Sequence, residues 1–127
     1  MPHNVTLNGR TADMRAVLDA MPGATSARSP VPPAALIYKV MGKVFAILSL
    51  RSVPAVGLKC DPHLGDILRE HYEGVGDYRH FLRNWISVAL DADVPWEEAL
   101  SLAAGSYELV CSGLTRKQKA ELGALLK

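Results

Sequence analysis

The sequence predicts an α+β fold, a two-layer sandwich in which an antiparallel sheet of about four strands carries helices on one face. Three observations predict it. The chain has 127 residues, of which 49% are hydrophobic and 21% charged, the composition of one globular domain spanning residues 1–127. Apolar and β-branched residues between positions 35 and 60 are interrupted only by short turns, which favour antiparallel neighbours. Strand and helix patterns do not alternate strictly, which disfavours a doubly wound parallel sheet.

The first half of the chain predicts one helix and three strands. Thr11 is placed as the N-cap of a helix that ends near residue 21 at a Pro-Gly pair. Residues 24–33 contain three prolines and predict a loop. Short turns then separate strands expected at residues 36–40, 43–50 and 55–60.

The second half predicts three helices and a fourth strand. Asp61 followed by proline is a typical helix start, and this helix is expected to reach about residue 72. Asp93 is placed as the N-cap of the next helix, which Gly113 ends, and Thr115 with Gln118 forms a capping-box pattern for the last. A loop is expected at residues 73–77 and a strand at residues 85–90.

Acidic and basic residues are unevenly distributed along the chain. The 14 lysines and arginines nearly balance the 13 aspartates and glutamates, for a net charge of +1. Residues 20–60 contain five bases and no acid, whereas residues 61–108 contain three bases and ten acids, and residues 109–127 contain four bases and one acid. The near-neutral total excludes a strongly basic protein, but it is compatible with one basic face.

The composition also predicts a soluble, cytoplasmic protein with no membrane contact. The first ten residues lack the basic start and apolar stretch of a signal peptide. The longest apolar run, residues 44–48, is far shorter than the roughly 20 residues that span a bilayer. Two cysteines 51 positions apart do not form a secreted disulfide framework.

The residue pattern predicts no metal site, no cofactor and no catalytic centre. Cys60 and His63 are spaced for two metal ligands, but Cys111 has no close partner, and structural zinc takes four ligands. Cys60 precedes a helix start, where a thiolate would be stabilised, yet a buried position on the core face is the favoured interpretation. Because no nucleophile, base and oxyanion donor come together, we expect that the protein is not an enzyme.

Strict alternation along the strands predicts which side chains face away from the helices. The apolar rows are expected to lie under the helices. The second strand has two apolar rows, so its orientation is assigned from Lys43, whose charge is expected to face solvent. No acid falls on any expected strand. The outward face is therefore expected to carry basic residues interleaved with apolar ones: Lys39, Lys43, Lys59, Ile37, Phe45, Ile47 and Trp85.

Three interpretations of this face remain open. It could attract an anionic polymer through its bases while aromatic rings stack or pack. It could be a protein-interaction or homodimerisation surface centred on Phe45, Ile47 and Trp85, because contiguous exposed apolar residues usually have a partner. It could also be a solvated face whose lysines discourage edge pairing.

Four blocks of residues resemble the MmcQ/YjbR family over about residues 11–122. The resemblance implies a CyaY-like (frataxin-like) α+β fold and DNA binding. Where members of that family often carry His-Met-Asn-Lys before the tryptophan, residues 79–84 here read Arg-His-Phe-Leu-Arg-Asn, so only the basic character is kept. The blocks are Lys39-Val40-Met41-Gly42-Lys43-Val44-Phe45-Ala46, Leu58-Lys59-Cys60-Asp61-Pro62, Trp85 with Val88 and Leu90, and Ser106-Tyr107-Glu108-Leu109-Val110.

Together these features predict a non-catalytic nucleic-acid-binding domain, with DNA as the expected partner. No helix-turn-helix or zinc-finger pattern supplies an element that reads a groove, so recognition is expected to be dominated by the phosphate backbone. The iron site of frataxin-like proteins is not expected, because the first helix has only Asp13 and Asp19 beside two arginines. Trp85 is expected to pack or stack, and the residues expected to contact phosphates are Lys39, Lys43, Lys59, Arg79, Arg83, Arg116 and Lys117.

Overall fold

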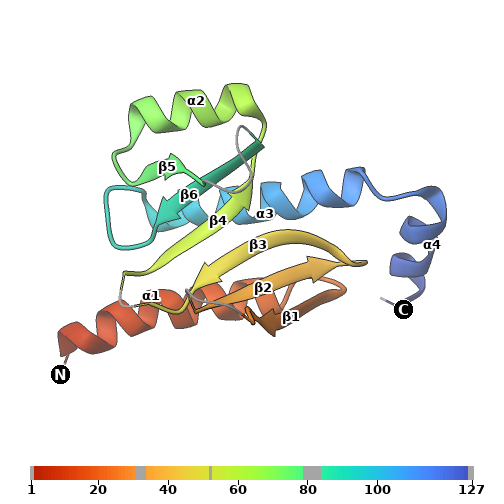
Figure 1. Cartoon of the computed structure of the whole chain (residues 1–127), viewed down its shortest axis with the longest axis horizontal. Helices are drawn as coiled ribbons and strands as arrows, with labels where there is room; N and C mark the ends of the chain where they lie inside the picture. Colours follow the sequence, from red (N-terminus) through yellow and green to blue (C-terminus); the bar gives the residue numbers. More distant parts are fainter. Residues whose placement is uncertain (1, 31–33, 52, 79–83, 126–127) are drawn as a thin grey trace.

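The computed structural model describes residues 2–30, 34–51, 53–78 and 84–125. These residues form an α+β fold with an open antiparallel sheet, so the predicted class is confirmed (Figure 1). The helices are α1 (Pro2–Asp19), α2 (Pro62–His71), α3 (Trp96–Ser112) and α4 (Arg116–Leu125). The strands are β1 (Ala24–Arg28), β2 (Ala35–Val40), β3 (Lys43–Ser49), β4 (Ala55–Lys59), β5 (Val75–Asp77) and β6 (Trp85–Ala89).

The sheet has six strands in the order β1-β2-β3-β4-β6-β5, so the expected number of about four is wrong. Both additional strands lie at its edges, and each comes from a segment expected to be a loop. β1 pairs with β2 and β5 pairs with β6, both antiparallel. Neither shows apolar alternation, because β1 reads ATSAR and β5 has only three residues. These two strands form because their backbones pair with a neighbouring strand that has a clear apolar pattern. Their own sequences do not predict them.

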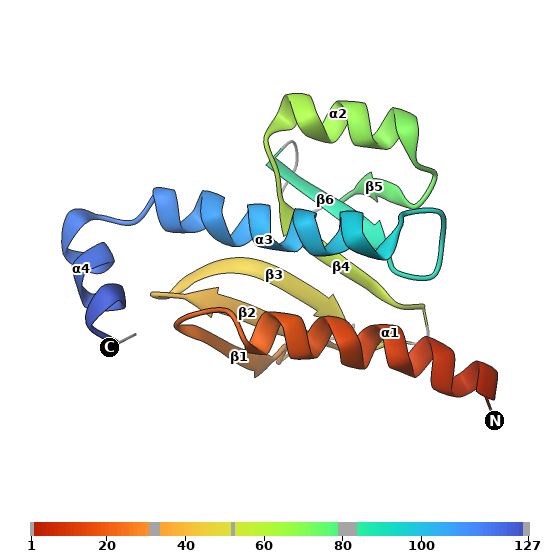
Figure 2. The same ribbon diagram turned by 180° about the vertical axis from the view of Figure 1, so that it is seen from behind.

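Three helices cover one face of the sheet. α1 packs against β1 and β3, α3 against β3 and β4, and α2 against β5 and β6. Seen from behind, α1 and α3 lie in front of the sheet (Figure 2). α4 lies beyond the C-terminal end of α3 and packs Leu122 against Gly23, so the expected two-layer description does not include it. Within the described residues, no helix covers the opposite face, which we call the open face.

The core lies between the sheet and these helices. Tyr38, Leu48, Leu58 and Ile86 from four neighbouring strands are fully buried there, together with Leu18 of α1. The β2–β3 hairpin holds this layer in register through a tight turn at Met41 and Gly42. Both residues have positive φ, 50° and 82°, the conformation of a type I′ turn.

Two of the four expected helix starts are confirmed and two are wrong. The Asp61 carboxylate accepts hydrogen bonds from the backbone N–H groups of His63 and Leu64 at the start of α2. Thr115 and Gln118 exchange the two hydrogen bonds of a capping box. Thr11, however, lies inside α1, which begins at Pro2.

Asp93 does not cap α3, whose N-cap is Pro95. Its carboxylate instead accepts hydrogen bonds from the backbone N–H groups of Glu73 and Gly74, at 2.9 and 2.7 Å. These two bonds hold the pKa of Asp93 below its usual value, because they favour the charged form. Asp93 thus ties the α2–β5 connection to the segment that enters α3.

Candidate functional site

One row of side chains crosses the open face through all six strands. Strand register aligns Ala27, Ile37, Ile47, Gly57, Ser87 and Gly76 in that order. The last three residues of the row are a serine and two glycines. Since small side chains leave space above a sheet, the face is lower over β4, β6 and β5 than over β2 and β3.

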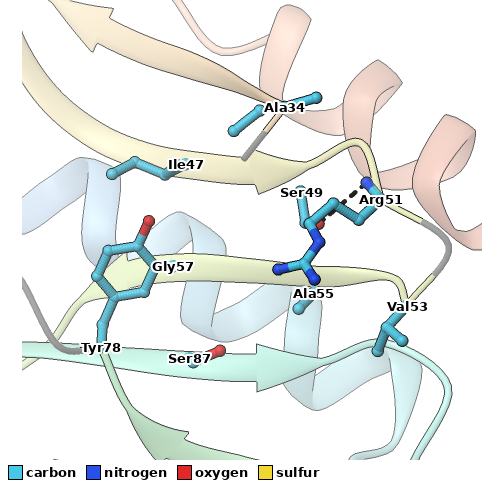
Figure 3. Close-up of a pocket in the computed structure, with 10 residues that line it drawn as sticks. Ala34, Ile47, Ser49, Arg51, Val53, Ala55, Gly57, Tyr78 and Ser87 are labelled. Carbon is cyan, nitrogen blue, oxygen red and sulfur yellow. Dashed lines mark hydrogen bonds between the residues drawn. The ribbon is translucent and has the colours of Figure 1, made fainter. Parts of the chain in front are cut away.

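A cavity of about 330 Å³ lies over this part of the open face, and we call it the hollow. Its lining residues come from β2, β3, β4 and β6 and from the segments next to them, as Figure 3 shows. They include no carboxylate. The lining residues are Ala34, Ala35, Ile47, Ser49, Arg51, Val53, Ala55, Gly57, Tyr78 and Ser87.

The aromatic ring in the hollow belongs to Tyr78, directly after β5. This ring lies over Gly57 with its hydroxyl toward Ile47 (Figure 3). A Cβ atom on Gly57 would stand only 2.6 Å from Cε1 of Tyr78, so a side chain there would collide with the ring. Burial raises the pKa of the Tyr78 phenol. Gly57 therefore lets the tyrosine ring rest directly on the sheet.

A single charged group, Arg51, projects into the hollow. It follows β3, and its backbone N–H donates to the Ser49 hydroxyl at 3.2 Å. Its exposed side chain extends across the hollow (Figure 3), and within the described part of the chain its guanidinium forms no ion pair or side-chain hydrogen bond. Neither Arg51 nor Tyr78 was singled out from the sequence. The only sequence signal for Arg51 was its place in the acid-free stretch.

No carboxylate of the described strands lies on the open face. The prediction that no strand carries an acid is wrong, because β5 includes Asp77. This residue pairs with Ile86 on the helix side of the sheet, and its carboxylate lies 3.3 Å from the Arg69 guanidinium of α2. The acids of α2 and α3 also belong to the helix side. The described open face therefore carries bases without a carboxylate, whereas the helix side carries the acids together with bases such as Arg15 and Arg69.

A β-bulge in β3 overturns the expected orientation of Lys43 and Phe45. The register shifts so that Tyr38 pairs with Ala46 and Lys39 with Val44, leaving Phe45 as an extra residue. Phe45 is consequently 0% exposed, and its ring centroid lies 5.3 Å from that of Tyr107 in α3. Lys43 points the same way and donates from Nζ to the Gly113 carbonyl at 3.4 Å. The prediction was wrong because it assumed strict alternation, which a bulge interrupts.

Ser106 of α3 satisfies two backbone groups beside this bulge. Its buried hydroxyl accepts from the Lys59 backbone N–H at 2.8 Å and donates to the Phe45 carbonyl at 2.5 Å. The register of β3 and β4 begins only at Ala46 and Leu58. The serine hydroxyl thus replaces a ladder hydrogen bond that the bulge removes.

Trp85 holds an open-face position but is not exposed there. It pairs with Lys59, yet only 6% of its surface is accessible, and the Tyr78 ring lies beside it at 6.3 Å between centroids. The expectation that Trp85 offers a free aromatic surface is wrong, since Tyr78 holds that position. With Phe45 also buried, Ile47 is the one member of the proposed interaction centre that still faces outward.

The predicted phosphate contacts occupy several places. Lys39 is exposed on the open face of β2 and Lys59 is half-buried at the end of β4. Arg79 and Arg83 lie outside the described residues. Arg116 and Lys117 are exposed on the first turn of α4.

The hydrogen bond from Lys43 to Gly113 brings α4 near the basic end of the sheet. It places the β2–β3 turn, next to Lys39, against the connection that leads to Arg116 and Lys117. Lys43 does not face outward, but it joins two groups of bases at this end of the molecule. A cation near the end of α3 also interacts favourably with the helix dipole.

The other perturbed groups have structural explanations. Cys60 is buried in the core, which confirms its expected position, and this burial raises the pKa of its thiol. Tyr38 donates its hydroxyl hydrogen to Asp19 at 2.8 Å, and burial together with this carboxylate raises its pKa to about 12. Among the described residues, no cluster of three or more His, Cys, Asp or Glu side chains could hold a metal ion. None of the described helices has the length and apolar character needed to cross a membrane.

The chain is an α+β protein in which helices cover one face of an antiparallel sheet. The described residues of the other face include bases and no carboxylate. Comparison with known proteins identifies the family within that class. The sequence profile of the YjbR family matches residues 19–109. Over 83 residues the chain is 30% identical to the uncharacterized protein YjbR of Escherichia coli K12, covering 64% of this chain and 70% of that protein. The chain belongs to the YjbR family, as the sequence blocks indicated.

Two solved structures share the fold. The crystal structure of Deinococcus radiodurans protein DR2400, which carries a DUF419 domain, has a TM-score of 0.79 at 31% identity and covers 88% of this chain and 86% of that one. A Pseudomonas syringae protein has a TM-score of 0.65 at 20% identity and covers 77% of this chain and 96% of its own. The second likeness concerns the fold alone.

Proposed function

We propose that the open face is a non-catalytic nucleic-acid-binding surface, with DNA as its first candidate ligand. The observation that carries the proposal is the separation of charge. The described open face contains bases and no carboxylate, while the acids of α2 and α3 lie on the other side. A surface of this kind attracts a polyanion and releases its counterions.

Two bases of the open face are suited to phosphate contacts, Lys39 and Arg51. Lys59 enters the proposal from the sequence, because it is half-buried and lines a second pocket, on the side of α2 and α3, together with Asp61 and Glu98. Arg116 and Lys117 would extend the basic track at the end where Lys43 meets Gly113. Arg79 and Arg83 enter the proposal from the sequence alone. Since these bases belong to strands, connections and one helix start, the contacts would follow the phosphate backbone and carry little sequence information.

The proposal that the protein is non-catalytic rests on the structural roles of three other residues whose pKa is shifted. Asp93 ties two connections together, Tyr38 anchors α1 to the sheet, and Cys60 is buried in the core. Each of these residues therefore has a structural role. The uncharacterized relatives do not suggest a reaction either.

A protein-binding surface is a second candidate, because the hollow is largely apolar. The interaction centre expected from the sequence is not available, because Phe45 and Trp85 are buried. Ile47 remains, and Val53 at the edge of the hollow is 63% exposed. An apolar partner residue could occupy this position.

Fluorescence anisotropy of labelled DNA at about 50 and 200 mM salt tests the leading proposal. Affinity should fall steeply with salt, and Lys39→Gln should reduce the slope of log K against log salt by about one. Arg15→Gln removes a comparable exposed charge from α1, on the other side of the sheet, and should leave the slope unchanged. Absence of binding at low salt, or equal slopes for both variants, would contradict the proposal. Sedimentation at high protein concentration tests self-association.

A further inference from the structure

We infer that a groove between α2 and α3 binds α4 of a second copy of this chain, reciprocally, in a twofold dimer. The groove has a volume of about 350 Å³ and lies on the helix side of the molecule. We call it the α2–α3 groove. Its lining includes Asp61 and Leu64 at the start of α2, and Glu98, Leu102, Gly105 and Leu109 along α3. The inference does not depend on the proposed function, which concerns the open face.

Apolar side chains are exposed around this groove. Leu64 is 43% and Leu109 is 40% exposed, one from each helix, and Ile67 on α2 is 50% exposed. Gly105 leaves the wall of α3 open beside them, because a Cβ there would meet nothing within 4 Å. Neighbouring exposed apolar side chains of this size usually have a partner. The groove is therefore a surface that a second molecule can cover.

The charges of the groove predict a basic occupant. Asp61 and Glu98 line it, and Glu97 lies exposed next to Glu98 in the first turn of α3. Neither glutamate forms an ion pair with another described residue. Lys59 is the one base among the lining residues. Charged groups across an interface are arranged so that opposite signs meet, so this surface fits a partner that carries several bases.

α4 has the charge and the exposed surface that this groove requires. Arg116, Lys117 and Lys119 are exposed on it and form no ion pair with another described residue. Leu125 is 69% exposed and can contribute an apolar contact. Leu122 is the one buried residue of the helix, so most of its surface is available to a partner.

The α4 that occupies the groove comes from another copy. Residues 113–115 lead α4 away from the groove within its own chain, to a position where Leu122 contacts Gly23. The C-terminal part of α3 extends past α2, so α4 lies beyond the end of α3 that is remote from Glu98 (Figure 2). In an antiparallel pair of α3 helices, the end that leads to α4 lies beside the groove of the other copy.

This arrangement is closed and its lengths agree. The ten residues of α4 extend about 15 Å, and Glu98 and Leu109 are about 17 Å apart along the axis of α3. Because each copy offers one α4 and one groove, the contact is the same in both directions. A contact of this kind produces a dimer with a twofold axis and does not propagate into a filament.

Sedimentation velocity of the full chain from about 1 μM to about 1 mM tests this inference. The wild type should change from monomer to dimer within this range. Leu64→Ser and Leu109→Ser each remove an apolar contact and should weaken association by about 10-fold or more. Val53→Ser is the matched control, because it removes an apolar side chain that is 63% exposed at the hollow. Its dimer affinity should stay within about 2-fold of the wild type.

An exchange of charges tests α4 as the occupant. Arg116→Glu with Lys117→Glu makes α4 acidic, and Glu97→Lys with Glu98→Lys makes the groove basic. Each double variant alone should be monomeric, because like charges then face each other. An equimolar mixture of the two should form dimers, since every α4 then meets a groove of opposite charge. Thermal unfolding of each variant confirms that it is folded.

Three outcomes would overturn the inference. A wild type that stays monomeric up to about 1 mM excludes a second copy as the occupant. A dimer that Val53→Ser weakens and Leu109→Ser does not would form through the open face. A dimer that Leu109→Ser weakens, but whose two charge variants do not associate when mixed, would involve the groove without α4. DNA binding is measured separately, so its absence would overturn the proposed function and leave this inference in place.

Discussion

Ser106 is a residue on which the shape of the sheet depends. Its hydroxyl joins the Phe45 carbonyl to the Lys59 N–H, across the gap that the bulge opens between β3 and β4. The residue is 1% exposed, so water cannot replace the hydroxyl. A small polar residue in the buried stripe of α3 is therefore part of the sheet's hydrogen bonding.

Replacing this hydroxyl should destabilise the protein. Ser106→Ala leaves two buried backbone groups without a partner and should lower the free energy of unfolding by about 1–3 kcal/mol, measured by urea denaturation. Ser101→Ala, an exposed position on the same helix, should change it by less than about 0.5 kcal/mol. Equal effects of the two substitutions would show that the Ser106 bonds contribute nothing.

Tyr38 should make stability fall at high pH. Its pKa is raised from 10.0 to about 12, so the folded protein holds the phenol proton more tightly than the unfolded chain. The stabilisation is complete below pH 10 and is lost as the pH rises toward 12. Urea denaturation should therefore show a steeper decline over this interval for the wild type than for Tyr38→Phe.

Titration of tyrosinate absorbance provides the control for this pH effect. Asp19→Asn removes the carboxylate that accepts the Tyr38 hydrogen bond and should lower the pKa of Tyr38. An unchanged absorbance titration in this variant would contradict the assigned cause.

At the scale of elements, the central strands were predictable from the sequence and the edge strands were not. Continuous apolar runs and tight turns indicate β2, β3, β4 and β6. β1 and β5 lack that signal, because an edge strand needs only one paired neighbour and little burial. The Asp93 interaction was equally hidden, since its partners are backbone groups 19 and 20 residues away.

The bulge in β3 could not be read from its sequence. Two apolar rows run along residues 43–49, and the lysine at the start was taken to decide between them. The extra residue lets Lys43 approach the end of α3 while Phe45 and Ala46 both enter the core. Two consecutive inward residues are compatible with the pattern but not implied by it.

The bulge makes Phe45 and Ile47 unequal, although strict alternation would place them on the same face. Phe45→Ala should lower the free energy of unfolding by about 3–5 kcal/mol, because it empties a site between Tyr38 and Tyr107. Ile47→Ala, on the half-exposed side, should cost clearly less. Chemical denaturation of both variants measures the difference, and equal losses would contradict the observed register.

At the scale of the whole molecule, charge segregation was the feature that the sequence indicated best. The acid-free segment, residues 20–60, forms β1 to β4, and the acidic segment, residues 61–108, forms α2, most of α3 and the strands β5 and β6. The near-neutral net charge is therefore compatible with a described open face that carries bases and no carboxylate.

The residues that form the hollow could not be predicted from the sequence. Gly57, Tyr78 and Arg51 belong to three different segments, and only the pairing of β4 with β6 and of β6 with β5 brings them together. Trp85 was the more conspicuous aromatic residue, but Tyr78 lies beside it at the surface. Register across several strands decides which of the two rings is the more exposed.

The most direct test of the account is a map of backbone amide chemical shifts during titration with (dT)8. The account predicts that the largest changes follow the open-face row, at Ile37, Ile47, Gly57 and Ser87, and that the exposed surfaces of α2 and α3 change little. Changes concentrated on α2 and α3, or no changes at low salt, would contradict the claim that the open face binds nucleic acid.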